Sequence, residues 1–185
     1  MITTRFSNVF DEETFKELVQ YFKNKKYRSL LREEGTHMYY CEIPEEYQKV
    51  LTKTLETHFQ KEVEILHTFG RINTSKHDTV FRIHADGKVR GVQPTVAALF
   101  YLETSDNSGT AFYKHELKGD KAIEGEYAIF SEDDGKWSMT EKHYEEANSM
   151  LVYDSLLFHA RFPWVSRGTN TKNGRIVLVN FLKTI

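Results

Sequence analysis

The sequence is poor in cysteine and in net charge, and each shortage excludes a class of protein. Its 185 residues include one cysteine, Cys41, so an intramolecular disulfide and a zinc site of several cysteines are both excluded. Lysine and arginine total 25 against 27 for aspartate and glutamate, and the formal net charge is −2. This balance gives no electrostatic basis for binding nucleic acid or an anionic membrane, so we expect neither partner.

Long apolar segments are also absent. No apolar run approaches the roughly 20 residues that a membrane-spanning helix needs. The first residues, Met-Ile-Thr-Thr-Arg, lack the charged, apolar and small-residue pattern of a signal peptide. We therefore expect a cytoplasmic protein with a reduced cysteine. Nothing in the sequence indicates its oligomeric state.

Two amphipathic helices are expected in the first third of the chain. Apolar residues recur at helical spacing after Asp11, a plausible N-cap, and again after Pro44. These residues are Phe15, Leu18, Val19 and Phe22 in the first helix and Tyr47, Val50, Leu51, Leu55 and Phe59 in the second. Between the helices, residues 37–43 have the character of a short strand.

The remaining sequence is typical of short antiparallel strands. Val63 and Ile65 alternate with Glu62 and Glu64, the period of a half-buried strand. Further strands are expected at 79–83, 96–103, 110–113, 137–140, 150–153, 156–162 and 175–183. Turn residues separate them at 85–91, 105–109, 133–135 and 168–174.

This order of elements predicts an α+β protein that is mostly β. Many short strands without intervening helices indicate an antiparallel sandwich or barrel. We expect a single domain over residues 1–185, in which residues 1–60 form a helical support outside one sheet and residues 62–185 form the β core.

The motif Phe-Arg-Ile-His84-Ala-Asp86-Gly offers two metal ligands. Side chains alternate on an extended backbone, so His84 and Asp86 project to the same side. A second histidine from a distant strand would complete a facial triad, a ligand set that suits iron(II) and leaves open positions. The alternative interpretation is a hydrogen-bonded histidine and a turn aspartate at the end of a strand.

His159 is the best third ligand among the remaining histidines. It lies in Ser-Leu-Leu-Phe-His-Ala-Arg-Phe, an apolar run where an unpaired polar group costs about 1 to 3 kcal/mol. His143 lies among charged residues, Glu145 included, which indicates a solvated segment. His115 follows a strand and lies close in sequence to the Asp86 loop. The others, His37, His58, His67 and His77, precede the motif and are expected to be surface or packing residues.

Arg175 begins the last strand, Gly-Arg-Ile-Val-Leu-Val-Asn-Phe-Leu, whose two faces are both apolar. A buried arginine keeps its charge and needs an anion, ideally a bidentate carboxylate. The alternative is that Arg175 meets solvent at an exposed strand start. A dicarboxylate that chelates the metal at one end and meets Arg175 at the other would satisfy the first interpretation.

His-x-Asp, a distal histidine and an arginine on the following strand together resemble the 2-oxoglutarate and iron(II)-dependent oxygenase superfamily, especially its prolyl-hydroxylase-like branch. The runs Ala-Leu-Phe-Tyr-Leu-Glu at 98–103 and Ser-Gly-Thr-Ala-Phe-Tyr at 108–113 resemble strands of that branch. The similarity covers about residues 79 to 183, over half of the chain.

The resemblance implies a double-stranded β-helix, or jelly roll, with the N-terminal helices on its major sheet. It implies Fe(II) held by His84, Asp86 and His159, and 2-oxoglutarate held by Arg175. Tyr101 matches a tyrosine that meets the same carboxylate in some relatives; a core aromatic is the alternative. The implied activity is that of a dioxygenase that hydroxylates a substrate and releases succinate and CO2.

Two departures from the family pattern affect details outside the triad. An inserted loop at 164–173 separates His159 from Arg175, and Phe81 stands where several prolyl hydroxylases carry tyrosine. The resemblance also argues against a halogenase, because the carboxylate ligand is present, and against a nucleobase demethylase, because position 181 is phenylalanine rather than arginine.

The substrate is expected to be a small molecule or a protein side chain. Basic residues near the motif suggest the hypothesis of an acidic or phosphorylated substrate, with scattered surface charge as the alternative: Lys88, Arg90, Arg161, Arg167 and Lys172. The competing class is a metal-holding, cupin-like binding module or isomerase. Such a protein would share the strand pattern without needing an arginine for a dicarboxylate.

Overall fold

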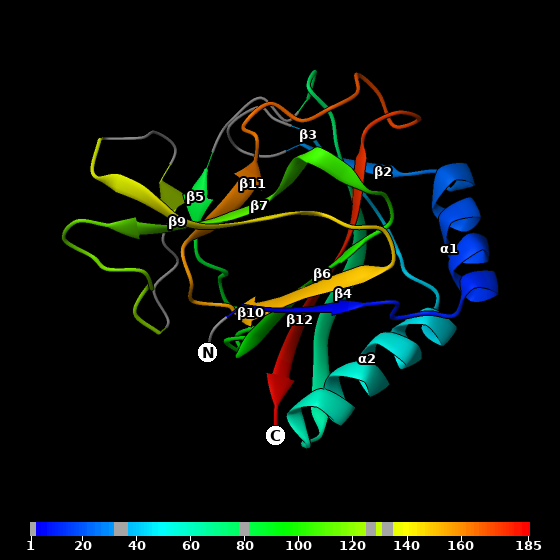
Figure 1. Cartoon of the computed structure of the whole chain (residues 1–185), viewed down its shortest axis with the longest axis horizontal. Helices are drawn as coiled ribbons and strands as arrows, with labels where there is room; N and C mark the ends of the chain where they lie inside the picture. The colour runs from blue at the N-terminus through cyan, green and yellow to red at the C-terminus, as the bar shows by residue number, and fades with distance from the viewer. Residues whose placement is uncertain (1–2, 32–36, 78–81, 125–128, 131–134) are drawn as a thin grey trace.

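A computed structural model describes residues 3–31, 37–77, 82–124, 129–130 and 135–185, which form two antiparallel sheets and two helices (Figure 1). The protein is mostly β, as the strand-like periodicity of the sequence predicts. Within the described residues, no helix is long and apolar enough to cross a membrane.

The larger sheet has seven strands and contains the end of the chain at its centre. Its order is β1 (Thr4–Ser7), β10 (Ser149–Asp154), β6 (Val96–Tyr101), β12 (Arg175–Thr184), β4 (Val63–Asn73), β3 (His37–Cys41) and β2 (Arg28–Leu31). Every residue of β6 is buried, because helices cover one face of this sheet and the second sheet covers the other.

The smaller sheet has five strands and faces the larger one. Its order is β8 (Ile129–Phe130), β5 (Ile83–His84), β11 (His159–Phe162), β7 (Ser105–His115) and β9 (Trp137–Glu145). Between β5 and β12 the chain changes sheets at β5–β6, β6–β7, β9–β10, β10–β11 and β11–β12, so residues far apart in sequence become cross-strand neighbours.

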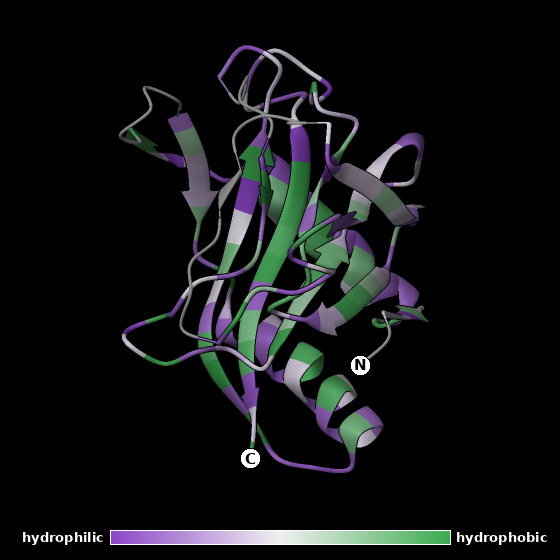
Figure 2. Cartoon of the chain, turned by 90° about the vertical axis from the view of Figure 1, so that its left-hand side faces the viewer, coloured by the Kyte–Doolittle hydropathy of each residue, from purple (hydrophilic) through white to green (hydrophobic). Residues whose placement is uncertain are grey.

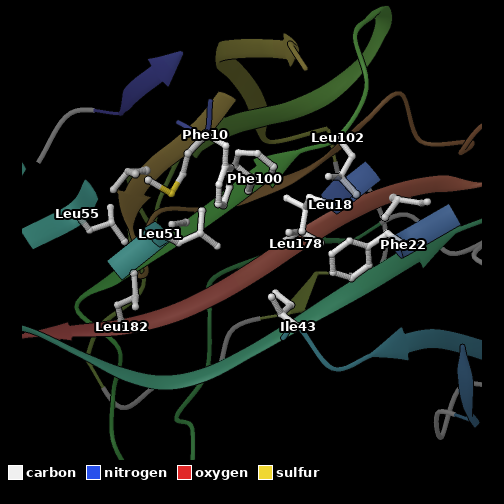
Figure 3. Packing of buried hydrophobic residues seen from close by; sticks show 14 of the residues in the cluster. Phe10, Leu18, Phe22, Ile43, Leu51, Leu55, Phe100, Leu102, Leu178 and Leu182 are labelled. Carbon is white, nitrogen blue, oxygen red and sulfur yellow. The ribbon is translucent and has the colours of Figure 1, made fainter. Parts of the chain in front are cut away.

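Helices α1 (Glu12–Asn24) and α2 (Glu45–Phe59) pack against the outer face of the seven-stranded sheet (Figures 1 and 2). The side chain of Asp11 caps α1 by accepting a hydrogen bond from the backbone N–H of Thr14 at 2.9 Å. Figure 3 shows the resulting core, in which Leu18 and Phe22 of α1 and Leu51 and Leu55 of α2 meet strand residues such as Phe100 and Leu178.

A second apolar layer fills the space between the two sheets. The seven-stranded sheet contributes most of it, and the five-stranded sheet contributes Phe112; the buried members are Ala97, Leu99, Tyr101, Phe112, Leu151, Tyr153, Val177 and Val179. Alternation along β6, β10 and β12 separates these residues from those that meet the helices. The inner layer therefore forms the floor beneath any site on the five-stranded sheet.

The sequence predicted both helices and most strands, but its boundaries differ from those observed. The turn expected at 105–109 is the first half of β7, and the first third of the chain contains strands β1 and β2 as well as helices. The strand expected at 79–83 and the turn expected at 133–135 fall partly outside the described residues, and Phe81 lies wholly outside them. Residues 163–174 form an irregular segment before β12, where an inserted loop was expected.

Candidate metal centre

His84 and Asp86 lie on the inner side of the five-stranded sheet because the chain is extended there. Their neighbours Ile83 and Ala85 point the other way and are fully buried in a cluster behind the sheet. Ala111 and Ala160, from β7 and β11, belong to the same rear cluster. The alternation that places these apolar side chains behind the sheet therefore directs the histidine and the carboxylate toward its front.

His159 reaches the same point from the neighbouring strand. It begins β11, pairs directly with His84 of β5, and is 5% exposed. One ligand atom from each of His84, Asp86 and His159 lies within 4.8 Å of the other two. The structure therefore brings together the three residues that the sequence singled out.

The hydrogen bonds of the two imidazoles determine which nitrogen faces the cluster. Nδ1 of His159 lies 2.9 Å from the backbone oxygen of Leu157, and Nδ1 of His84 lies 3.3 Å from that of Arg82. A carbonyl oxygen can only accept, so Nδ1 carries the proton in both rings. Each Nε2 then keeps a lone pair, the arrangement that metal-ligating histidines require.

Asp86 is a buried carboxylate with unused bonding capacity. Its Oδ2 is buried without a hydrogen-bond partner among the described residues, and Oδ1 lies 3.8 Å from Nε2 of His159. Burial raises the pKa of Asp86 to about 6, an effect that nearby His159 partly offsets. Two imidazole nitrogens beside an uncompensated carboxylate oxygen fit a divalent transition metal such as iron(II).

Tyr153 approaches the cluster from the floor of the site. Its buried hydroxyl lies 3.1 Å from Nε2 of His159, and its ring packs on the His159 ring with centroids 4.8 Å apart. Because Nδ1 of His159 carries the proton, Nε2 accepts from the tyrosine O–H. Burial raises the pKa of Tyr153 well above its usual value, so the hydroxyl stays protonated.

Arg175 is buried at the start of β12, with 5% of its surface exposed, which contradicts the interpretation that it meets solvent. Its anionic partner is a residue of the chain itself. Nε of Arg175 donates to Oε1 of Glu145, whose side chain is 1% exposed. The other two nitrogens donate to Oδ1 of Asn73 at 3.3 Å and to the backbone oxygen of Gly109 at 3.2 Å.

Tyr101 links the surroundings of Arg175 to strand β7 of the five-stranded sheet. The Arg175 guanidinium stands 5.9 Å from the centre of its ring, and its hydroxyl lies 2.9 Å from Oγ1 of Thr110. Thr110 and Phe112 share a face of β7, and Phe112 pairs directly with His159. Two residues of strand span about 7 Å, so Thr110 and its partner Tyr101 lie roughly this far from the triad along β7. A short dicarboxylate could bridge such a distance.

The five basic residues proposed to surround the site differ in their surroundings. Lys88, Arg90 and Lys172 are exposed. Nε of Arg161 donates to the backbone oxygen of Trp164 at 2.8 Å. Arg167 pairs instead with Glu103 and Glu145, so its charge is directed to acidic residues of the protein, which argues against its part in the hypothesis of an acidic or phosphorylated substrate.

Sequence reasoning missed Glu145, Tyr153 and Thr110. Glu145 was assigned to a solvated segment, but it ends β9 as its one fully buried residue, since the rest of that strand is partly or fully exposed. The need of a buried Arg175 for an anion was a signal that an acidic residue would be close. Tyr153 and Thr110 had no signal beyond strand periodicity, because their roles depend on pairing between distant strands.

No protein-family model matches the sequence, and no curated protein matches it either. Solved structures do match the fold. The epimerase SnoN, in complex with Fe3+, alpha ketoglutarate and nogalamycin RO, superposes with a TM-score of 0.59 at 10% identity, over 98% of this chain and 78% of SnoN. HygX from Streptomyces hygroscopicus, with nickel, 2-oxoglutarate and hygromycin B bound, gives 0.59 at 13% identity, over 98% of this chain and 82% of HygX.

A Pseudomonas putida prolyl-4-hydroxylase also matches, with a TM-score of 0.55 at 11% identity, over 98% of this chain and 91% of that enzyme. Identities this low establish a shared fold and nothing finer. The architecture is therefore that of solved 2-oxoglutarate and iron(II) oxygenases, which is the likeness that the motifs of the sequence indicate.

Proposed function

We propose that this protein is a non-haem Fe(II), 2-oxoglutarate-dependent dioxygenase with His84, Asp86 and His159 as its metal ligands. The observation that carries the proposal is the buried Oδ2 of Asp86, which has no partner among the described residues and lies in a cluster with two histidines. An ionised carboxylate in this position is costly unless a cation compensates it. The same fold holds iron or nickel with 2-oxoglutarate in SnoN and HygX.

The two sheets support the finer assignment of a double-stranded β-helix. The chain passes from β5 to β6, from β6 to β7, from β10 to β11 and from β11 to β12 by changing sheets each time. We assign residues 1–185 to one such domain, with the helices on the outside of the seven-stranded sheet, and we expect it to act in the cytoplasm.

Iron(II) with 2-oxoglutarate, when bound, would supply oxidation by O2, in which one oxygen atom enters succinate as CO2 is lost from the co-substrate and the other oxidises a substrate C–H bond. The residues of the chain hold and orient the reactants. The Nδ1–H groups of His84 and His159 donate to carbonyl oxygens, which fixes both rings and makes Nε2 the nitrogen that can ligate a metal. The apolar layer beneath the triad excludes water from one side of the site.

Arg175, Tyr101 and Thr110 form the proposed pocket for the far carboxylate of 2-oxoglutarate. Arginine has five N–H groups, and the three bonds of Arg175 to described residues leave one N–H on each terminal nitrogen for an incoming carboxylate. The hydroxyls of Tyr101 and Thr110 can add a further hydrogen bond.

The substrate class that the comparisons favour is a small molecule. SnoN and HygX carry nogalamycin RO and hygromycin B in their structures, whereas the similarity to a prolyl-4-hydroxylase keeps a protein side chain open. Hydroxylation is the outcome that we propose, because Asp86 is retained. An epimerase and a carbocyclase share the fold, so the assay must also detect products with no added oxygen atom.

The proposal is tested by measuring succinate from 2-oxoglutarate in the presence of Fe(II), oxygen and a reductant. We expect slow succinate formation without substrate, and faster formation when a metabolite mixture contains the substrate. His58→Ala, which alters an exposed histidine on α2, is expected to retain this activity, and Asp86→Ala to lose it. If the metal-bound protein formed no succinate with any substrate mixture, the assignment as a 2-oxoglutarate-dependent dioxygenase would be refuted.

A metal-holding, cupin-like module or isomerase remains the second candidate, and one observation favours it. Arg175 already has a carboxylate partner in Glu145, so the buried arginine does not require a dicarboxylate ligand. This candidate predicts that the protein binds metal but not 2-oxoglutarate. The dioxygenase assignment predicts that it binds both.

A further inference from the structure

The carboxylate of Glu145 is held by more than one donor. Besides Nε of Arg175, Oε1 accepts from the hydroxyl of Ser108 at 2.8 Å, and Oε2 lies 3.1 Å from Nη2 of Arg167. Each donor comes from a different segment: β12, β7 and the irregular residues 163–174. Glu145 is therefore a fixed negative charge that contacts Arg175, one of the residues of the proposed pocket for 2-oxoglutarate.

The charges of this cluster balance without any ligand. Arg175 and Arg167 supply two positive charges, and Glu145 and Glu103 supply two negative ones, Glu103 through its contact with Arg167. Lys23 approaches Glu103 at 3.9 Å and is half exposed, so water screens its charge. A second carboxylate arriving at Arg175 would enter a cluster that is already neutral and would face the negative charge of Glu145.

We propose that Glu145 sets the affinity of this site for dicarboxylates, by neutralising in the free protein the charge of the guanidinium that the far carboxylate of 2-oxoglutarate uses. The inference rests on the proposed function. Like charges in a buried site repel strongly, so a carboxylate beside Arg175 binds more weakly while Glu145 keeps its charge. Glu145 acts on the co-substrate through Arg175 and is a specificity-determining residue with no part in the chemistry.

Arg167 gives Glu145 a second cationic partner, so the strength of the Glu145–Arg175 pair can vary. It is 30% exposed, lies in an irregular segment, and bonds the oxygen of Glu145 that does not face Arg175. When a dicarboxylate binds, Glu145 can keep its bond to Arg167 while it shares or yields Arg175. Removal of Arg167 would leave Arg175 as the one cation on Glu145 among the described contacts, and it would make the site harder to enter.

The test compares two keto acids that differ at the far end. Calorimetry under anaerobic conditions measures the Kd of 2-oxoglutarate and of pyruvate for the Fe(II)-loaded protein and for Glu145→Gln. Both keto acids chelate a metal, but pyruvate lacks the carboxylate that would reach Arg175. Glu145→Gln is expected to bind 2-oxoglutarate about tenfold more tightly and pyruvate with unchanged affinity.

Glu146→Gln is the matched control. It removes the same charge at the next residue, where the side chain is half exposed and pairs with Arg5 instead of the buried arginines. We expect its Kd for both keto acids to equal that of the wild type. Pyruvate binding by Glu145→Gln also reports that the metal end of the site is intact in the variant.

Arg167→Gln gives an independent reading if Glu145→Gln does not fold. We expect it to weaken 2-oxoglutarate binding severalfold and to leave pyruvate binding unchanged. Equal or weaker 2-oxoglutarate binding by a folded Glu145→Gln, equal or tighter 2-oxoglutarate binding by Arg167→Gln, or a matching change for pyruvate would overturn the role of Glu145 while leaving the oxygenase intact. Wild-type protein that binds metal but no 2-oxoglutarate would overturn the proposed function itself.

Discussion

His84 and His159 are cross-strand partners, paired between β5 and β11, with ring centroids 4.4 Å apart. A separation of 75 residues in sequence thus becomes direct contact because β5 and β11 are neighbours in the five-stranded sheet. Asp86 follows His84 on the same face, so the three proposed ligands come from two short segments. The proposed metal site consequently depends on strand pairing, and it should form only in the folded protein.

Removing one proposed ligand should strongly weaken metal binding without unfolding the chain. His84→Ala is expected to weaken Fe(II) or Co(II) binding more than about 100-fold, because a two-ligand site cannot replace the lost imidazole. Equilibrium dialysis measures the affinity, and circular dichroism verifies the fold. His58→Ala should bind metal as the wild type does; equal loss in both variants would show that the triad is not the site.

The metal-free protein should become more stable when Asp86 is neutralised. Burial raises the pKa of Asp86 from its ordinary value of 3.8 to about 6, so the folded state favours the protonated form, and ionisation above this pKa costs stability. Asp86→Asn is therefore expected to increase the free energy of unfolding by about 1 to 3 kcal/mol at pH 8 without metal.

Urea unfolding at pH 8 and at pH 5 measures this effect. The advantage of Asp86→Asn should shrink as the pH falls from 8 to 5, since wild-type Asp86 gains its proton over this window. A variant less stable than the wild type at pH 8 would contradict the account of Asp86 as an uncompensated charge.

Tyr153→Phe should bind metal more tightly. In the metal-free protein the Tyr153 hydroxyl donates to Nε2 of His159, and a metal must displace that bond to reach the lone pair. A hydrogen bond of this kind contributes about 1 kcal/mol net, so the variant should gain about fivefold in metal affinity and lose about 1 kcal/mol of metal-free stability. Weaker metal binding would instead mean that the hydroxyl supports the bound metal.

Gly70→Ala should loosen α1 from the sheet. A Cβ at position 70 would lie 2.6 Å from Cε1 of Phe22 and 3.0 Å from Sγ of Cys41, so the helix must shift. We expect a loss of about 1 to 3 kcal/mol. The reactivity of Cys41 toward a thiol reagent reports the shift: burial raises its pKa to about 11 and keeps the wild-type thiol inert, whereas the variant should react faster. Equal reaction rates would contradict this packing.

The sequence predicted those parts of the fold that depend on local patterns. Apolar spacing after Asp11 and Pro44 indicated α1 and α2, and alternation at Val63 indicated β4, because each signal is contained within one element. Strands β1 and β2 escaped prediction, since edge strands of this kind depend on partners elsewhere in the sheet. The run at 105–109 was expected to be a turn because it is polar and contains glycine, but only Asp106 and Asn107 are exposed, and Ser108 and Gly109 are buried in β7.

The sequence predicted those residues of the candidate site whose side chains can ligate a metal and whose local pattern sets them apart. His84 and Asp86 share a face through simple alternation, and His159 stands out as a histidine in an apolar strand. The partner of Arg175 was not predicted, because the buried position of Glu145 depends on Ser108, Arg167 and Arg175 arriving from three other segments. Charge alone suggested that Glu145 was solvated.

The most direct test of the central claim is an anaerobic titration of Fe(II) into the protein with and without 2-oxoglutarate. We predict a visible metal-to-keto-acid charge-transfer band that appears only when both are present, and that is absent in His84→Ala and in Asp86→Ala. Wild-type protein that binds Fe(II) but develops no such band with 2-oxoglutarate would contradict the oxygenase assignment.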